Sequence, residues 1–351
     1  MLDKVALPKS PGKSIEPMSH DPRVSNASFI IGYCCIGGAS LFWAISASMG
    51  RAVFLGRFHL FGTFVPFVSP LMLTQSRVTL AACVLFPVLW IVRGRTAVRM
   101  KLVDVRDCMI VGILGIAASN YLNYLSIQRT NVATAIILQY QAPVFVLCWM
   151  LLRKLQPPTV LRISGVLVSV AGSVLAIGVV SHSVHFPWLA ILPGQIRFDV
   201  IGVVAALLAA VAFAFYNVFG RHLVKAHDPW TVLAWALAGA AIGWVFISPP
   251  WKVIAAHYTG PQWAFMGLFS ITSILIPFAL YSAGLHRLDA TRAIVISCLQ
   301  PVFSVLIAAV TLGELVNRIQ IAGILLVLAS TILVQLETQQ NGTAPPCEPT
   351  E

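Results

Sequence analysis

Charged side chains are scarce in this chain: they make up 10% of its 351 residues, whereas 58% are hydrophobic and the mean hydropathy is +0.86. A soluble globular domain carries about 25% charged residues. The strict apolar and polar alternation of barrel strands is also missing. Because lipid offers no water to the backbone, long apolar segments in a membrane must be helices. The composition therefore predicts an all-α, multi-pass membrane protein.

Ten apolar runs are long enough to cross a bilayer, which takes roughly 20 residues per helix. They lie near residues 29–49, 70–92, 108–127, 131–152, 158–180, 199–220, 229–248, 262–285, 290–312 and 317–336. With ten crossings, sixteen of the 23 Lys and Arg fall on the side of the termini and six on the other, with Arg77 inside a run. Such an excess marks the cytoplasmic side. Both termini are thus predicted to be cytoplasmic, and no basic patch is left to bind a nucleic acid.

A repeated segment divides the chain into two halves. A shift of 158 residues places "AIILQYQAPVFV" (135–146) over "AIVISCLQPVFS" (293–304), so that Pro143 falls on Pro301. A shift of 170 places "AISASMGR" (44–51) over "AFYNVFGR" (214–221). Because each half holds five runs, an odd number, the second half is predicted to cross the membrane in the opposite sense. Inverted repeats with interrupted helices at a central site are a recurring plan of secondary transporters.

This division predicts five parts along the chain. The N-terminal tail has no cleavable signal pattern, so the first apolar run is expected to be an uncleaved anchor. The parts are a polar cytoplasmic tail (1–27), a first repeat (28–180), an external linker (181–198), a second repeat (199–336) and a disordered cytoplasmic tail (337–351).

The order of motifs along both halves resembles a known family. The segments that carry the resemblance are "LFWAISASMGR" (41–51), "SRVTLAACVLF" (76–86), "NYLNYLSIQRTNVATAIILQYQAPVF" (120–145) and "LYSAGLHRLDATRAIVISCLQPVFSVLIAAVTLGE" (280–314). Over about residues 30–336 the chain resembles the EamA family of the drug/metabolite transporter superfamily. The resemblance implies a carrier of small metabolites, such as amino acids, sugars, nucleotide sugars or drugs. In one departure, the Gly-Glu pair with which family halves often end the fourth and ninth helices is kept at Gly313 and Glu314 but replaced by "LLRKLQPP" (151–158) after the fourth.

Polar residues beside the two repeated prolines are the first candidates for a substrate site. A polar side chain within a span is costly unless it faces the bundle interior or a wet cavity. Ser297, Gln300 and Pro301 share one helix face, and the repeat maps Gln139 and Pro143 onto Ser297 and Pro301. Each proline frees the carbonyl one turn earlier, which could accept a hydrogen bond from a substrate amine. The alternative is that the prolines only kink their helices while the amides bond a neighbour.

The third helix supplies a second group of polar candidates, Asn120, Asn123 and Tyr124, and the sixth adds Asn217. A cluster of polar side chains within five residues is difficult to hide from lipid. The alternatives to a solute site are hydrogen bonds between helices or, for the tyrosines, a belt at the membrane interface.

Two aromatic residues and one arginine complete the candidate site. Trp43 and Tyr281 could stack on a flat or apolar solute, although single aromatic residues more often only pack. Arg77 could hold a substrate carboxylate or phosphate. The alternative role of Arg77 is that of a structural anchor, which bonds helix carbonyls or reaches outward to the membrane surface.

Acidic residues are missing from the middle of every predicted span. All twelve lie in tails, loops or helix ends. Coupling to protons or sodium usually relies on a carboxylate within the membrane, so facilitated diffusion, exchange or export down a gradient is favoured. Glu314, at the outer end of the ninth helix, is expected to be a cap or to form an ion pair.

These observations predict a secondary transporter of the cytoplasmic (inner) membrane that works by alternating access. Its partners would be the lipid bilayer and a solute that bears an amine and a carboxylate, such as an amino acid. Alternatives are a transporter of sugars, nucleosides or drugs, a channel, and a non-transporting scaffold or sensor. The eight histidines fall in loops or at span ends, so neither catalysis nor a metal or other cofactor is expected. Small residues spaced along "GVLVSVAGSVLAIG" (165–178) predict a helix contact or a homodimer face.

Overall fold

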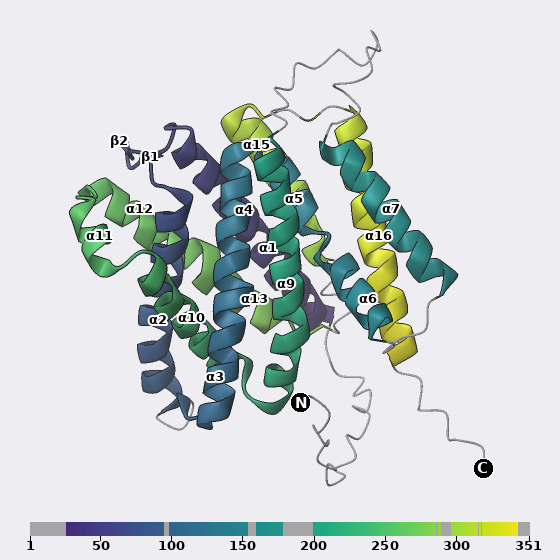
Figure 1. The fold of residues 1–351 in the computed structure, drawn as a ribbon, viewed down its shortest axis with the longest axis horizontal. Helices are drawn as coiled ribbons and strands as arrows, with labels where there is room; N and C mark the ends of the chain where they lie inside the picture. The colour runs from purple at the N-terminus through teal and green to yellow at the C-terminus, as the bar shows by residue number, and fades with distance from the viewer. Residues whose placement is uncertain are drawn as a thin grey trace.

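The computed structural model describes residues 26–94, 98–153, 159–177, 199–285, 287–288, 296–314, 316 and 318–342, and Figure 1 shows that helices pack side by side through most of this part. The first half holds α1 (Asn26–Phe54), α2 (Pro70–Arg93), α3 (Leu102–Val111), the π-helical stretch η2 (Gly112–Ala117), α4 (Ala118–Arg129), α5 (Val132–Gln139), α6 (Ala142–Leu152) and α7 (Val160–Ile177). The second holds α9 (Val200–Ala226), α10 (Pro229–Ile247), α11 (Pro250–Ala255), α12 (Gly260–Ser270), the π-helical stretch η4 (Ile271–Leu275), α13 (Ile276–Leu285), α15 (Leu299–Leu312) and α16 (Arg318–Gly342).

The described helices are those of a multi-pass membrane protein. Six stretches are long and apolar enough to cross a bilayer: 29–54, 70–93, 132–150, 200–224, 229–247 and 260–284. Apolar helices of 10 to 17 residues cover 163–175, 299–312 and 318–333. The helical segment over 102–129 is not among the six, and it is the one that carries Asn120, Asn123 and Tyr124. The predicted number of ten crossings and the inverted sense of the second half stay predictions.

Two details differ from the sequence-based expectation. A short antiparallel hairpin, β1 (His59–Leu60) with β2 (Thr63–Phe64), follows α1, so the described part is not purely α-helical. Helix α16 also continues to Gly342, past residue 337, where the C-terminal tail was expected to begin. Glu and Gln in this stretch are good helix formers, which extends the helix past its apolar part. Residues 1–25, 343–351 and the whole predicted linker (181–198) lie outside the described part.

The two halves carry the same irregularities at corresponding positions. The fourth helix breaks at Tyr140 and Gln141 between α5 and α6, and the ninth breaks at Cys298 just before α15. The shift of 158 residues places Tyr140 on Cys298. The same shift places η2 on η4 to within one residue. The segment that occurs twice in the sequence (135–146 and 293–304) therefore contains an interruption of the helix in each half.

The first helix of each half packs into the other half. Helix α1 contacts α13 and α15, while α9 contacts α4, α5 and α6. A Cβ on Gly32 would lie 2.7 Å from Leu288 Cγ, and one on its repeat counterpart Gly202 would lie 2.6 Å from Thr130 Cγ2. Thr130 and Leu288 are themselves counterparts at the shift of 158. The same close contact thus occurs twice, which supports a twofold relation between the halves.

Helices α7 and α16 pack along each other at one side of the bundle (Figure 1). A Cβ on Gly172 would lie 2.9 Å from the carbonyl oxygen of Gly323, so the two backbones nearly touch. Ser169 donates to Oε1 of Gln141 at 2.9 Å, and Gln141 Nε2 donates to Ser173 Oγ at 2.6 Å. The small residues of α7 thus form a helix contact within the chain, and a homodimer stays a prediction.

Candidate functional site

The interrupted fourth and ninth helices meet through Tyr140. Its hydroxyl donates to the carbonyl oxygen of Ser297 at 2.9 Å and lies 3.3 Å from Oε1 of Gln300. Because Pro301 has no backbone N–H, it cannot donate to the carbonyl of Ser297 four residues earlier, and Tyr140 supplies a donor there. The structure thus brings Ser297, Gln300 and Pro301 together with a tyrosine that sequence reasoning had not selected.

The signal that could have identified Tyr140 is its position. It is the residue at which the fourth helix breaks, three residues before Pro143, and its repeat counterpart is Cys298. Its partner on the ninth helix is 157 residues away in sequence, so no local pattern connects them.

Gln139 and Pro143 lie on either side of this break but do not join the Tyr140 contacts. The Gln139 side chain reaches Ser119 Oγ on α4, at 3.4 Å between Nε2 and Oγ. Ser119 in turn donates to the carbonyl oxygen of Ala209 on α9 at 3.0 Å. Pro143 is half-buried in the first turn of α6. For Gln139 the structure fits the alternative that the amide bonds a neighbouring helix.

Arg77 is buried on α2, and its side chain forms hydrogen bonds with α4 and with η4. One terminal nitrogen donates to Asn120 Oδ1 at 3.1 Å and to the Tyr124 hydroxyl at 3.2 Å, and the other to the carbonyl oxygen of Ser273 at 2.9 Å. Its side chain is a cation, and among the described residues no acid forms an ion pair with it. The predicted candidates Arg77, Asn120 and Tyr124 therefore form one cluster, and the bond to Ser273 fits the alternative of a structural anchor.

Polar atoms near this cluster are left without partners. The Nε of Arg77, Oδ1 of Asn123 and Oγ of Ser273 are buried and have no hydrogen-bond partner among the described residues. A buried polar atom without a partner costs free energy of about 1–3 kcal/mol. The cluster thus keeps unused capacity both to donate and to accept hydrogen bonds.

The aromatic candidates lie together, while Asn217 lies apart. Trp43 on α1 has ring centroids 5.7 Å from Phe278 and 5.8 Å from Tyr281, both on α13. This cluster joins the two halves of the chain. Asn217 is exposed on α9, and its amide donates to the carbonyl of Phe213 on its own helix at 2.8 Å. The structure therefore does not bring Asn217 into polar contact with the other candidates.

Glu314 forms an ion pair, one of the two roles expected from the sequence, and also accepts a hydrogen bond from the start of α5, whose N-cap is Asn131. Its Oε1 accepts from Nε of Arg51 at 2.6 Å, and its Oε2 accepts from the backbone N–H of Val132, the first residue of α5, at 3.2 Å. Arg51 also donates to the carbonyl oxygens of Ile127 and Gln128 at 2.8 and 2.9 Å. One ion pair thus joins the ends of α1, α4 and α15 to the start of α5.

The chain is similar to known membrane transporters. The inner membrane transporter YicL of Salmonella typhimurium, itself uncharacterized, is 24% identical over 69% of this chain and 76% of its own length. The threonine/homoserine exporter RhtA of the same species is 25% identical over 64% of this chain and 71% of its own length. A solved crystal structure with 19% identity superposes with a TM-score of 0.55 over 91% of this chain and 99% of that chain, which shows a shared fold alone. The model of the EamA-like transporter family matches residues 30–178 and 200–336. The chain therefore belongs to the EamA-like transporter family.

Proposed function

We propose that this protein is a secondary transporter that moves an amino acid or a related small metabolite across the cytoplasmic membrane by alternating access. The observation that carries the proposal is the contact of Tyr140 with Ser297 and Gln300. It places a freed carbonyl and an amide where the interrupted helices of the two halves meet. In inverted-repeat transporters, interrupted helices between the halves form the substrate site.

The chemistry of the two polar groups fits a solute with an amine and a carboxylate. The carbonyl of Ser297 and the amide oxygen of Gln300 both accept hydrogen bonds, as an ammonium group requires. Arg77 carries a positive charge without an acidic partner among the described residues, and its Nε has no hydrogen-bond partner there. A guanidinium is well suited to bind a carboxylate. RhtA, a relative that exports threonine and homoserine, supports the same substrate class.

The positions of the acids support transport without ion coupling. The six long apolar stretches contain no acid. Asp199 and Asp228 cap the starts of α9 and α10, and Glu314 is paired with Arg51. With these carboxylates at helix ends, export or exchange down the gradient of the solute itself is the mechanism we propose.

We also propose that the chain crosses the cytoplasmic (inner) membrane ten times and that both of its termini lie in the cytoplasm. The distribution of Lys and Arg and the repeated contacts of Gly32 and Gly202 support this orientation. Rocking of one half against the other would then expose the site to each side in turn.

A second candidate substrate is a flat solute such as a nucleoside or a drug. The observation in its favour is the cluster of Trp43, Phe278 and Tyr281, whose rings come from both halves. Aromatic rings bind planar apolar groups well. Sugars are a third class that the family resemblance leaves open.

The test is efflux from proteoliposomes loaded with labelled amino acids, sugars or nucleosides, with and without a pH gradient. We expect saturable efflux of an amino acid that does not depend on the pH gradient and that falls in Gln300→Ala. Thr311→Ala is the matched control, because Thr311 lies on the same helix, is exposed and bonds its own helix at Ile307. A requirement for the pH gradient would refute uncoupled transport. Flux that does not saturate would indicate a channel, and no flux of any solute would favour a scaffold or a sensor.

A further inference from the structure

The predicted outer end of the bundle is held closed by one carboxylate. We call the ends of α1, α4 and α15 and the start of α5 the outer rim. Glu314 comes from the second half of the chain, whereas its partners Arg51 and Val132 come from the first. The side chains of Arg51 and Glu314 are only 8% and 18% exposed. Each contact of this carboxylate therefore crosses between the halves and would be broken if the halves separated at this end.

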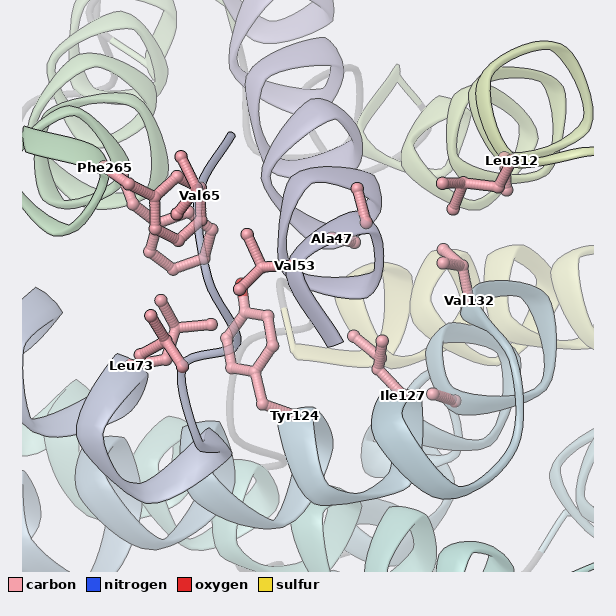
Figure 2. Close-up of a cluster of buried hydrophobic side chains, with 14 of the residues drawn as sticks. Ala47, Val53, Val65, Leu73, Tyr124, Ile127, Val132, Phe265 and Leu312 are labelled. Atoms are coloured by element: carbon pink, nitrogen blue, oxygen red, sulfur yellow. The ribbon is translucent and has the colours of Figure 1, made fainter. Parts of the chain in front are cut away.

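Apolar side chains from the helices that carry the ion pair form one buried cluster. Figure 2 shows side chains from both halves gathered there, including Ala47, Val53 and Tyr124, with Val132 and Leu312 facing each other. All of these are buried, and Ala47, one helical turn before Arg51, is 3% exposed. A Cβ on Gly50 would lie 2.9 Å from the ring of Tyr124, so α1 rests directly on that ring. Among the described residues, these buried side chains of both halves are thus packed against one another next to the outer rim.

The opposite end of the bundle lacks these features at the corresponding positions. The shift of 170 places Arg51 on Arg221 and the buried Ala47 on Asn217, which is exposed. The shift of 158 places Glu314 on Gln156, a residue outside the described part that carries no charge. The position that corresponds to Glu314 at the inner end therefore carries no carboxylate.

We propose that the Arg51–Glu314 pair is a latch that closes the outer rim, so that the resting protein is open toward the cytoplasm and loads its solute from there. The inference rests on the orientation given under the proposed function and adds a direction to it. Opening to the outside must separate a largely dehydrated ion pair and break the hydrogen bond from the Val132 N–H to Glu314. At the predicted inner end, Arg93–Asp228 and His227–Asp104 also join the halves, but these side chains are 42% and 44%, and 25% and 28% exposed. Exposed ion pairs contribute little, so the better buried outer pair shifts the equilibrium toward the state that is closed outside.

Accessibility of single cysteines tests the latch without any need to know the solute. In the full chain with all seven native cysteines replaced, Ala47→Cys and Asn217→Cys are introduced separately. A membrane-impermeant maleimide is then applied to intact cells or to inside-out vesicles. We expect the cysteine at 217 to react in inside-out vesicles, and the cysteine at 47 to be protected in intact cells.

The latch predicts what a second substitution does. Adding Glu314→Gln, which keeps the shape and removes the charge, should raise the rate of labelling at 47 from outside by about tenfold, the effect of a shift of 1.4 kcal/mol. Arg51→Lys should act in the same direction, because an ammonium cannot bond Glu314 and two carbonyls in the same fork. Thr311→Ala on the same helix should change nothing. Retained labelling at 217 shows that each variant is folded and inserted.

Two results would overturn the latch. Labelling at 47 from outside in the chain with Arg51 and Glu314 intact would show that the outer rim is not closed at rest. Unchanged protection at 47 in both Glu314→Gln and Arg51→Lys, with 217 still reactive, would show that the ion pair does not hold the rim. Because labelling needs no substrate, either result would leave the proposed transport of amino acids untouched, and failed efflux would leave the latch untouched.

Discussion

The crossing of η2 with α10 allows a stringent test of how closely these helices pack. A Cβ on Gly112 would lie 1.9 Å from the carbonyl oxygen of Ala236, and one on Gly239 would lie 2.4 Å from Cα of Met109. The nearest atoms that each added Cβ would meet belong to the backbone of Ala236 and of Met109, and backbone atoms cannot rotate away as a side chain can. Such close approach of backbones is what small residues permit in membrane helices. We therefore predict that Gly112→Ala strongly destabilises the protein.

The size of the effect follows from the geometry. Cβ contacts below 3.0 Å essentially never occur, so the two helices must separate by about 1 Å or more, an overpacking that typically costs about 1–3 kcal/mol. Gly267→Ala is the matched control, because it lies inside α12 and a Cβ there would have no atom within 4 Å. In a helix interior that change is favourable by up to about 1 kcal/mol. The two Gly→Ala variants are thus expected to differ by about 1–4 kcal/mol.

Thermal unfolding in detergent, followed by the fraction that stays monodisperse, measures this difference. We expect a midpoint several degrees below that of the native chain for Gly112→Ala and an unchanged or slightly higher midpoint for Gly267→Ala. Equal midpoints for the two variants would refute the close crossing of η2 and α10.

Two further substitutions examine the polar groups. Arg77→Lys keeps the charge but cannot bond Asn120 and Ser273 together, so we expect a loss of about 1–3 kcal/mol, measured as a lower midpoint of thermal unfolding; an unchanged midpoint would contradict the anchoring role. Tyr140→Phe removes one hydroxyl, and the loss of its bond to Ser297, about 1 kcal/mol, should lower the efflux of the transported amino acid about fivefold. Tyr33→Phe at an exposed position of α1 is the control for it, and equal efflux from both variants would show that the Tyr140 hydroxyl is not needed.

The course of the helices could largely be predicted from the sequence, because apolar length is a local signal. The predicted run at 229–248 corresponds to α10 at 229–247, and the run at 70–92 to α2 at 70–93. The π-helical stretches could not be predicted in this way. The first of them, η2, lies at the close approach of Gly112 to Ala236, a tertiary contact that no pattern within a single helix reveals. The hairpin after α1 was missed for the related reason that two-residue strands carry too short a pattern.

The site was predicted as separate residues and not as an arrangement. Arg77, Asn120 and Tyr124 were selected because a polar side chain within a span is costly unless it faces the bundle interior or a wet cavity. The structure joins these three residues in one hydrogen-bond network. The same reasoning selected Asn217, which bonds only its own helix among the contacts described. Composition could not separate these cases, because the difference lies in which face of a helix meets a neighbour. Tyr140 was missed because its role depends on a carbonyl in the other half of the chain.

The pairing of α7 with α16 has a consequence for the order in which the protein is made. Helix α16 follows α7 along the chain, so it leaves the ribosome after α7. Until then the surface of α7 around Gly172 has no partner, although α7 was completed some 140 residues earlier. During synthesis α7 must wait in the bilayer or be held by another factor. A chain cut short before residue 318 would keep this surface uncovered, which gives the cell a means to recognise an unfinished transporter.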